Sequence, residues 1–401
     1  MKKWLTGSLA FALLLGGCVP GFQKEDKVVE ENKEEEGQTG IIPSFQVSED
    51  YYKILLQSQT GESKFQPSAA RGSVVTNINT RFDVTEFETG LMRLAQIEFS
   101  PDKYYFREGQ TLDTETVNSW LSRKMTPEQL EEKGMEPEEN VGLNPALSDE
   151  EAKSQEAHKE KPLYIAHMLE HNYYVKSEGD SVKLAGMTIG IALNSYYYYR
   201  EYQEDGTFIS REVEIDKKDR KKYGEQAAQE IVSRLRADED LKDIPIMVAL
   251  FEQQEKSAVI PGNFIEYSFL DKGTTNISSW ESVNEKYFLF PSNEAEEAHR
   301  DDYQYFQNFK GDVEEYFPNF NGVIGTGFYR GDELTELKIE IPIQFYGKAE
   351  TIGLAQYIKE LIIDHFPDYI KLQISVTSVD GPEILFVREA GEKEPFVHVY
   401  E

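Results

Sequence analysis

The C-terminal half of this 401-residue chain contains two stretches that share one order of hydrophobic patterns. In each stretch, segments in which apolar and polar residues alternate flank a segment whose apolar residues recur with helical spacing. The alternating segments are 211–216 and 244–250 in the first stretch and 337–345 and 370–376 in the second. Val213 and Ile244 are 31 residues apart, as are Ile339 and Ile370, so the two stretches superpose at an offset of 126 residues. This agreement predicts a repeated structural unit.

Each stretch also has one more predicted strand before it and one after it. These strands are 187–193 and 263–269 in the first stretch and 322–328 and 383–389 in the second. The unit is therefore predicted to be β-β-α-β-β, with an amphipathic helix packed on a sheet. We expect an α+β fold with two tandem units of this kind, at 179–290 and 291–401. A smaller N-terminal mixed α+β region, at 51–178, precedes them.

The N-terminal mixed region combines apolar segments with an acidic insert. Residues 87–99 and 163–175 carry apolar residues at roughly helical spacing, so both are predicted to be helices. Residues 126–161 between them are rich in carboxylates and contain prolines, which is typical of a long surface excursion.

The extreme N-terminus has the parts of an export signal. Lysines at positions 2 and 3 precede an apolar stretch at 5–15, which is shorter than the roughly 20 residues of a membrane-spanning helix. The sequence Leu-Gly-Gly-Cys follows at 15–18, and Cys18 is the only cysteine of the chain. This ending resembles the lipobox of bacterial prolipoproteins.

The lipobox resemblance implies that residues 1–17 are a signal peptide, cleaved between Gly17 and Cys18. The Cys18 sulfur would carry a diacylglyceryl group with fatty acids such as palmitate, and two acyl chains hold a protein stably on a bilayer. We therefore expect a lipid anchor on the outer face of the cell membrane. The alternative is an incidental cysteine in an ordinary signal peptide.

The segment after the cysteine is predicted to be a tether. Residues 23–50 are rich in Glu and Lys and contain few aromatic residues, so residues 18–50 should be a solvated linker. A flexible linker of this length reaches on the order of 30 Å. An interaction tail is the alternative interpretation.

The charge of the chain excludes some classes of partner. With 42 Lys and Arg against 73 Asp and Glu, the formal net charge is -31, which disfavours nucleic-acid binding. The glycines of 321–328 lack the G-x-G-x-x-G order and the following helix of a dinucleotide site, so no cofactor is predicted.

One short motif could carry metal chemistry. The sequence His-Met-Leu-Glu-His at 167–171 matches the H-x-x-E-H pattern of inverted zinc peptidases, in which two histidines one helical turn apart hold zinc and the glutamate activates water. His167, Glu170 and His171 would take these roles. The alternative is packing of a histidine-containing helix, and no flanking sequence supports the peptidase. No catalytic residue is predicted, and a zinc hydrolase remains as the alternative function.

A run of tyrosines at 194–202 is a candidate binding surface. On a strand alternate side chains share a face, so Tyr196 and Tyr198, or Tyr197 and Tyr199, could lie together. Tyrosine rings can stack on sugar rings or contact a protein partner. Packing within a hairpin or core is the alternative role.

Several segments of the chain resemble one family. They are 71–83, 87–110, 142–147 and 163–174, together with the lipobox and the duplicated C-terminal pattern. They are similar to the CamS family, the sex pheromone cAM373 precursor lipoproteins of Gram-positive bacteria. The resemblance implies that proteolysis of the signal peptide releases a short hydrophobic peptide that induces plasmid mating, here from residues 9–17. We therefore expect a lipid-anchored surface protein whose folded body binds or scaffolds an unidentified envelope ligand or protein.

Overall fold

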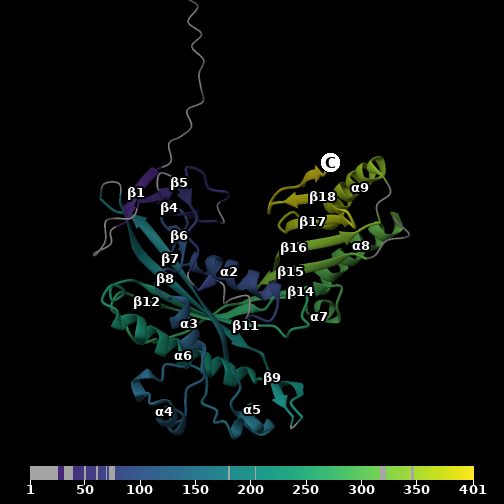
Figure 1. The fold of residues 1–401 in the computed structure, drawn as a ribbon. Helices are drawn as coiled ribbons and strands as arrows, with labels where there is room; N and C mark the ends of the chain where they lie inside the picture. The colour runs from purple at the N-terminus through teal and green to yellow at the C-terminus, as the bar shows by residue number, and fades with distance from the viewer. Residues whose placement is uncertain are drawn as a thin grey trace, which may run out of the picture.

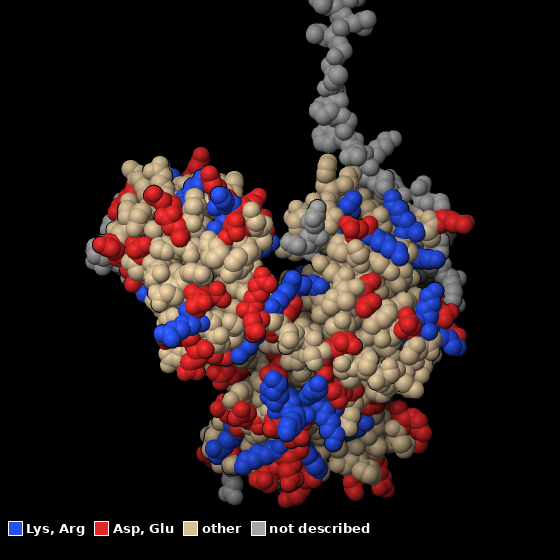
Figure 2. Space-filling model, turned by 180° about the vertical axis from the view of Figure 1, so that it is seen from behind, with Lys and Arg blue, Asp and Glu red and all other residues tan. Residues whose placement is uncertain are grey.

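The computed structural model describes residues 26–30, 39–48, 51–59, 62–68, 70–71, 77–178, 181–203, 205–316, 322–344 and 347–401. These residues form two lobes, each built around its own sheet (Figure 1). Seen from behind, the lobes are separated by a notch at their upper ends and are in contact below it (Figure 2).

The first lobe holds an eleven-stranded mixed sheet. Its strands are β1 (Asp26–Glu30), β2 (Thr39–Ile42), β3 (Lys53–Ile54), β4 (Leu56–Gln59), β5 (Glu62–Lys64), β6 (Tyr105–Glu108), β7 (Ile165–Lys176), β8 (Ser181–Asn194), β11 (Ile246–Gln253), β12 (Asn263–Leu270) and β13 (Glu281–Ser282). Strand β8 is at the centre, antiparallel to β7 and parallel to β11.

Helices lie on both faces of this sheet and at its lower end (Figure 1). They are α2 (Arg81–Ala95), α3 (Thr114–Leu121), α4 (Pro127–Lys133), η1 (Pro137–Glu139), η2 (Glu151–Lys153), α5 (Gln155–Glu160) and α6 (Lys217–Ala237). On β8, Ile189 and Ile191 pack with the apolar face of α6, whereas Ala192 packs with the face that carries α2. Gly190 lies against α2, because a Cβ there would be 2.9 Å from a ring carbon of Phe87. The near-continuous apolar sequence of β8 follows from burial on both faces.

The second lobe holds a six-stranded sheet with its helices on one face. The strands are β14 (Glu285–Phe290), β15 (Ile324–Arg330), β16 (Glu333–Pro342), β17 (Lys371–Ser378), β18 (Gly381–Arg388) and β19 (Phe396–Val399), in that order. The helices are α7 (Asn293–Ala298), α8 (Arg300–Tyr316) and α9 (Lys348–His365). Phe306 and Phe309 of α8 and Ile358 of α9 are buried against alternate residues of β16 and β17. The strict alternation of this sheet reflects burial of one face.

The mixed α+β class is confirmed, but the predicted form of the tandem repeat is not. Segment 211–216 was expected to be a sheet strand, equivalent to 337–345. Its residues lie in and after β10 (Phe208–Glu214), which pairs only with β9 (Tyr196–Tyr202) in a separate hairpin. The parallel partner of β11 is β8 instead. The alternation of 211–216 comes from a two-sided hairpin, which has the same period as a sheet strand.

The same succession of pairings does occur in both lobes. Strands β7, β8, β11 and β12 are joined by antiparallel, parallel and antiparallel pairings, and so are β15, β16, β17 and β18. Along the chain, α6 lies between the two parallel strands of the first lobe, and α9 lies between those of the second. In the first lobe, the β9–β10 hairpin lies between the second strand and the helix. The two strands before the helix therefore do not correspond at the expected offset.

Three further expectations change. The predicted helix at 163–175 is wrong, because these residues form most of β7, whereas the predicted helix at 87–99 overlaps α2. The tether prediction does not hold for β1 and β2, in which Val28 and Ile42 are buried in a small core with Leu55 and Val182. The second sheet begins with β14, a few residues before the expected boundary at 291.

One polar cluster joins the two lobes. Arg93 of α2 donates two hydrogen bonds to Glu285 of β14, at 3.2 and 2.8 Å, and also pairs with Glu86. The hydroxyl of Tyr287 donates to Glu86 at 2.6 Å. The Arg93 guanidinium also lies 4.5 Å from the ring centre of Phe328. We call Glu86, Arg93, Glu285 and Tyr287 the lobe junction.

Within the described residues, no helix has the length and apolar composition needed to cross a bilayer.

Candidate functional site

The predicted anchor lies outside the described residues. Gly17 and Cys18 are both in the N-terminal part that is not described, as is the predicted signal peptide. The first described segment is β1, at the far end of the first lobe from β9 (Figure 1).

The structure does not bring His167, Glu170 and His171 together as a metal site. All three lie on β7, where a separation of four residues along a strand is about 13 Å, against one helical turn in the predicted arrangement. Among the described residues, no group of three or more His, Cys, Asp or Glu side chains is placed to hold a metal ion. The period-2 geometry of the strand thus removes the zinc interpretation.

The Glu170 carboxylate has a structural role in the first lobe. It accepts hydrogen bonds from the backbone N–H groups of Gln110, Thr111 and Leu112, at 2.8 to 3.2 Å. The side-chain amide of Asn172, two residues along the strand, donates to it at 2.9 Å. The buried carboxylate therefore fixes the loop that follows β6, since it satisfies amide groups that would otherwise be buried without partners.

The two histidines are packed as neutral aromatic side chains. The ring of His171 meets that of Phe106 edge-on at 4.8 Å, and the ring of His167 lies 6.4 Å from that of Phe87. Burial lowers the pKa of His167 to about 4 and that of His171 to about 3. Within the described structure, three ring nitrogens have no hydrogen-bond partner: Nδ1 and Nε2 of His167, and Nδ1 of His171.

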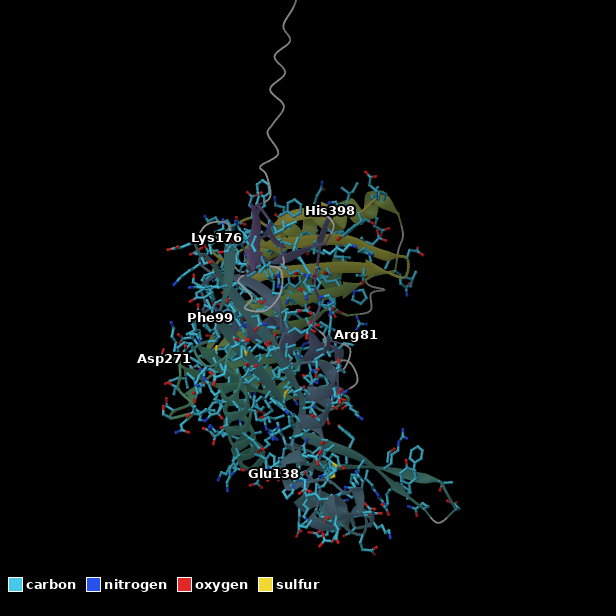
Figure 3. All side chains as sticks on the ribbon, turned by 60° about the vertical axis from the view of Figure 1, so that its left-hand side comes forward. Arg81, Phe99, Glu138, Lys176, Asp271 and His398 are labelled. Carbon is cyan, nitrogen blue, oxygen red and sulfur yellow. The ribbon has the colours of Figure 1, made fainter. Side chains whose placement is uncertain are left out.

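The tyrosine run forms β9 of the hairpin, which projects from the lower end of the first lobe (Figure 1, Figure 3). As predicted for a strand, alternate rings share a face. Tyr197 and Tyr199 stack at 5.4 Å, and the ring of His158 from α5 stacks on Tyr199 at 3.8 Å. The Tyr197 hydroxyl contacts His158 and accepts from Arg123. This inner face of the hairpin is therefore occupied by packing against the lobe.

The opposite face of the hairpin carries the other predicted pair. The rings of Tyr196 and Tyr198 are half-buried, and their centres are 6.5 Å apart. Further along the same face, Tyr202 is directly opposite Phe208, and the side chains are 69% and 48% exposed. We call this surface the hairpin outer face. Its members are Tyr196, Tyr198, Arg200, Tyr202, Phe208, Glu212 and Glu214.

Charged groups surround the rings of the hairpin outer face. The Lys256 ammonium lies 4.2 Å from the ring centre of Tyr198, and the Arg200 guanidinium lies 4.5 Å from that of Phe208. Glu214 lies near Tyr196 and raises the pKa of its hydroxyl. The face thus combines aromatic rings with hydrogen-bonding groups of positive and of negative charge.

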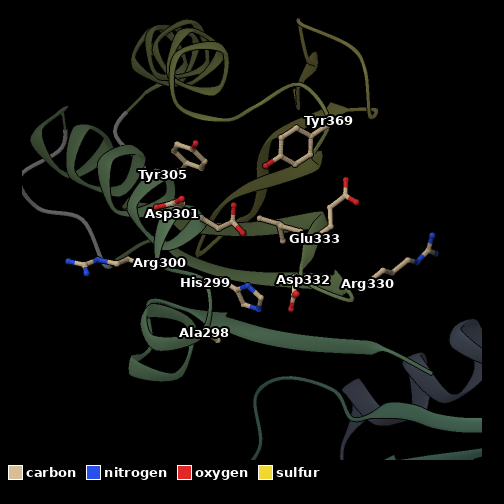
Figure 4. A pocket seen from close by; sticks show the side chains of 11 residues that line it. Ala298, His299, Arg300, Asp301, Tyr305, Arg330, Asp332, Glu333 and Tyr369 are labelled. Atoms are coloured by element: carbon tan, nitrogen blue, oxygen red, sulfur yellow. The ribbon is translucent and has the colours of Figure 1, made fainter. Parts of the chain in front are cut away.

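A second candidate surface lies in the second lobe. It is a hollow of about 730 Å³ between the start of α8, the β15–β16 turn and the loop before β17 (Figure 4). We call it the acidic hollow after the side chains Asp301, Asp302, Tyr305, Asp332, Glu333 and Tyr369. Sequence reasoning missed it, because its residues come from three separate segments and none forms a motif. The only local signal was two aspartates at a helix start, which the helix dipole explains equally well.

Comparison with known proteins identifies the family. The family described as CamS sex pheromone cAM373 precursor matches residues 65–394. No curated protein is similar enough to be matched. A sex pheromone precursor from Lactobacillus salivarius subsp. salivarius is 28% identical over 89% of this chain and 98% of its own, with a TM-score of 0.77. The C-terminal domain of the sex pheromone staph-cAM373 precursor from Staphylococcus aureus is 33% identical over 81% of this chain and 98% of its own, with a TM-score of 0.69. The chain therefore belongs to the CamS sex pheromone cAM373 precursor family.

Proposed function

We propose that the protein is a lipid-anchored binding protein of the bacterial cell envelope that takes glycan chains on its hairpin outer face. The observation that carries this proposal is the set of aromatic side chains on one face of a projecting hairpin, two of which are about half exposed or more. Large aromatic side chains seldom remain exposed side by side without a binding role. The C–H face of a pyranose ring packs on such rings, while its hydroxyl groups bond to nearby charged groups.

The position of the hairpin supports an envelope ligand. An anchor at Cys18 would hold the chain at its N-terminal end, and β1 is the described strand nearest that end. The β9–β10 hairpin lies at the opposite end of the lobe (Figure 1). A molecule tethered in this way presents the hairpin outward from the membrane, toward the wall polymers.

The signal peptide has a second role in this proposal. Cleavage before Cys18 would leave a hydrophobic fragment that ends in Phe-Ala-Leu-Leu-Leu-Gly-Gly at 11–17. The name of the family describes its members as precursors of a sex pheromone. Residues 9–17 are therefore proposed as a peptide that can be processed to a pheromone.

Glycan binding is tested with the purified full chain in detergent and insoluble peptidoglycan sacculi. Tyr196→Ala and Tyr202→Ala should each weaken binding about tenfold, since the loss of one stacked ring costs roughly 1.4 kcal/mol. Phe396→Ala is the matched control, because Phe396 is an exposed aromatic residue on β19 of the other lobe, and it should leave binding unchanged. Equal binding by all three variants would show that the hairpin outer face is not the glycan site.

A further inference from the structure

The acidic hollow contains more negative charge than its helix explains. Asp301 and Asp302 lie in the first turn of α8, where carboxylates are stabilised by the helix dipole. Asp332 comes from the β15–β16 turn and Glu333 is the first residue of β16, where no such effect acts. Within the described part of the chain, none of these four carboxylates forms an ion pair.

The cationic side chains of the hollow do not neutralise its centre. In Figure 4, the guanidinium groups of Arg300 and Arg330 point outward at opposite ends of the hollow. Arg330 is paired with Glu285 of the lobe junction, with 3.5 Å between Nε and Oε1. The middle of the hollow is lined by the carboxylates, by His299 and by two tyrosines.

The tyrosines give the hollow aromatic walls. Tyr305 of α8 is 37% exposed and Tyr369, before β17, is 47% exposed. The Tyr369 hydroxyl points toward the middle of the hollow (Figure 4). Aromatic faces attract ammonium groups through their negative quadrupole, and this attraction adds to that of carboxylates.

Buried and half-buried side chains form the floor of the hollow. The His299 ring stacks on the buried Tyr329 ring at 3.8 Å, and the Tyr329 hydroxyl donates to Asp302 at 3.0 Å. Burial raises the pKa of Asp302, because the carboxylate is partly withdrawn from water, and the Tyr329 hydroxyl and His299 offset only part of this effect. A bound cation would stabilise the charged carboxylate further.

We propose that the acidic hollow binds a flexible organic cation that carries several primary ammonium groups. The volume of about 730 Å³ is much larger than one ammonium group, so the ligand is a chain that extends past both tyrosines. Two sources have this chemistry: a free aliphatic polyamine, and the lysine side chains of a basic peptide.

The test measures binding of spermidine and of a tri-lysine peptide to the full chain in detergent by isothermal titration calorimetry. We expect at least one of these ligands to bind the parent protein. The Asp332→Asn/Glu333→Gln double variant should bind that ligand about tenfold or more weakly, since two ammonium–carboxylate contacts are lost. Both residues are exposed, one in the turn and one at the first position of β16, so this variant should keep the fold. Glu392→Gln, at another exposed acidic position, is the control and should bind as the parent does.

The tyrosine walls give a second, independent readout. Tyr369→Phe keeps the ring and should retain most of the affinity for the amine, whereas Tyr369→Ala should lower that affinity severalfold. Binding of spermidine alone identifies a polyamine as the ligand, and binding of the peptide alone identifies a basic peptide. The proposal is overturned if neither ligand binds at up to about 1 mM, or if the double variant binds no more weakly than Glu392→Gln. Tyr196→Ala should not change amine binding, so this result is separable from glycan binding.

Discussion

His167 and His171 show how strongly the environment of a residue decides what it can do. In the sequence their spacing matches a metal-binding motif, but in the structure each is buried on a strand beside aromatic rings. Burial penalises the charged imidazolium, and for His171 no nearby charge offsets this penalty. Both side chains are therefore held neutral, and this has a consequence for stability.

Acid should destabilise the protein partly through these two histidines. In the unfolded chain each histidine binds a proton as the pH falls through about 6.5, whereas in the folded protein the pKa is about 4 for His167 and about 3 for His171. The free energy of unfolding therefore falls by about 1.4 kcal/mol per pH unit per histidine between these limits. Above pH 6.5 neither histidine contributes to the slope.

The measurement is urea unfolding of His171→Phe at pH 7, 6 and 5. The variant should lose less stability across this range than the parent, because one histidine that binds a proton in the unfolded chain but not in the folded protein is gone. His398→Phe, at an exposed histidine, should follow the parent. Equal slopes for His171→Phe and the parent would contradict a buried neutral His171.

At the scale of elements, one guanidinium group pairs with carboxylates of both α2 and β14. Arg93 is placed between two carboxylates, Glu86 on its own helix and Glu285 on the first strand of the other lobe. Their side chains are only 6% and 12% exposed, so removal of the arginine leaves two poorly hydrated negative charges side by side.

Arg93→Met should therefore lower the stability of the protein by about 3–5 kcal/mol, measured as a shift in the urea midpoint. Lys286→Met is the matched control on β14, because Lys286 forms an exposed ion pair with Glu294, and such pairs contribute about 1 kcal/mol or less. Small-angle scattering should also show a change in the relative position of the lobes for Arg93→Met alone. If the two variants shift the midpoint equally, the lobe junction does not stabilise the contact.

At the scale of the molecule, two sheets with separate cores meet at the lobe junction. In our proposal, a lipid at the N-terminal end of the mature chain anchors both lobes to the membrane. Lipidation precedes signal cleavage in the lipobox interpretation, so anchor and peptide depend on one sulfur. Cys18→Ser should remove the fatty acid detected by mass spectrometry on the mature N-terminus and abolish release of fragments of residues 9–17.

The same variant can be checked in cells. Cys18→Ser protein should keep residues 1–17 attached, whereas the parent should sediment with membranes and release a peptide that is active in a mating-response assay. If the parent protein sediments with membranes but carries no fatty acid, the proposed lipid anchor is wrong. If no peptide from residues 9–17 gives a response, the pheromone part of the proposal fails and the anchor is unaffected.

Local pattern was sufficient for much of the fold. Period-2 alternation located β12 and β16 to β18, and helical spacing located most of α2, α6 and α9, because these elements each bury one face and the sequence records which face it is. The tyrosine run was also interpreted correctly as a strand with two distinct faces, since alternation of side chains is a property of the strand itself.

Tertiary structure decided the rest, because the deciding partners are distant in sequence. Strand β7 is buried on both faces, so its apolar run carries no period, and a helix and a strand remain equally compatible with it. The β9–β10 hairpin has the same alternation as a sheet strand, and only the pairing of β8 with β11 excludes it from the sheet. The acidic hollow unites α8, the β15–β16 turn and Tyr369, and the lobe junction unites α2 with β14, so neither could be found until the chain had folded.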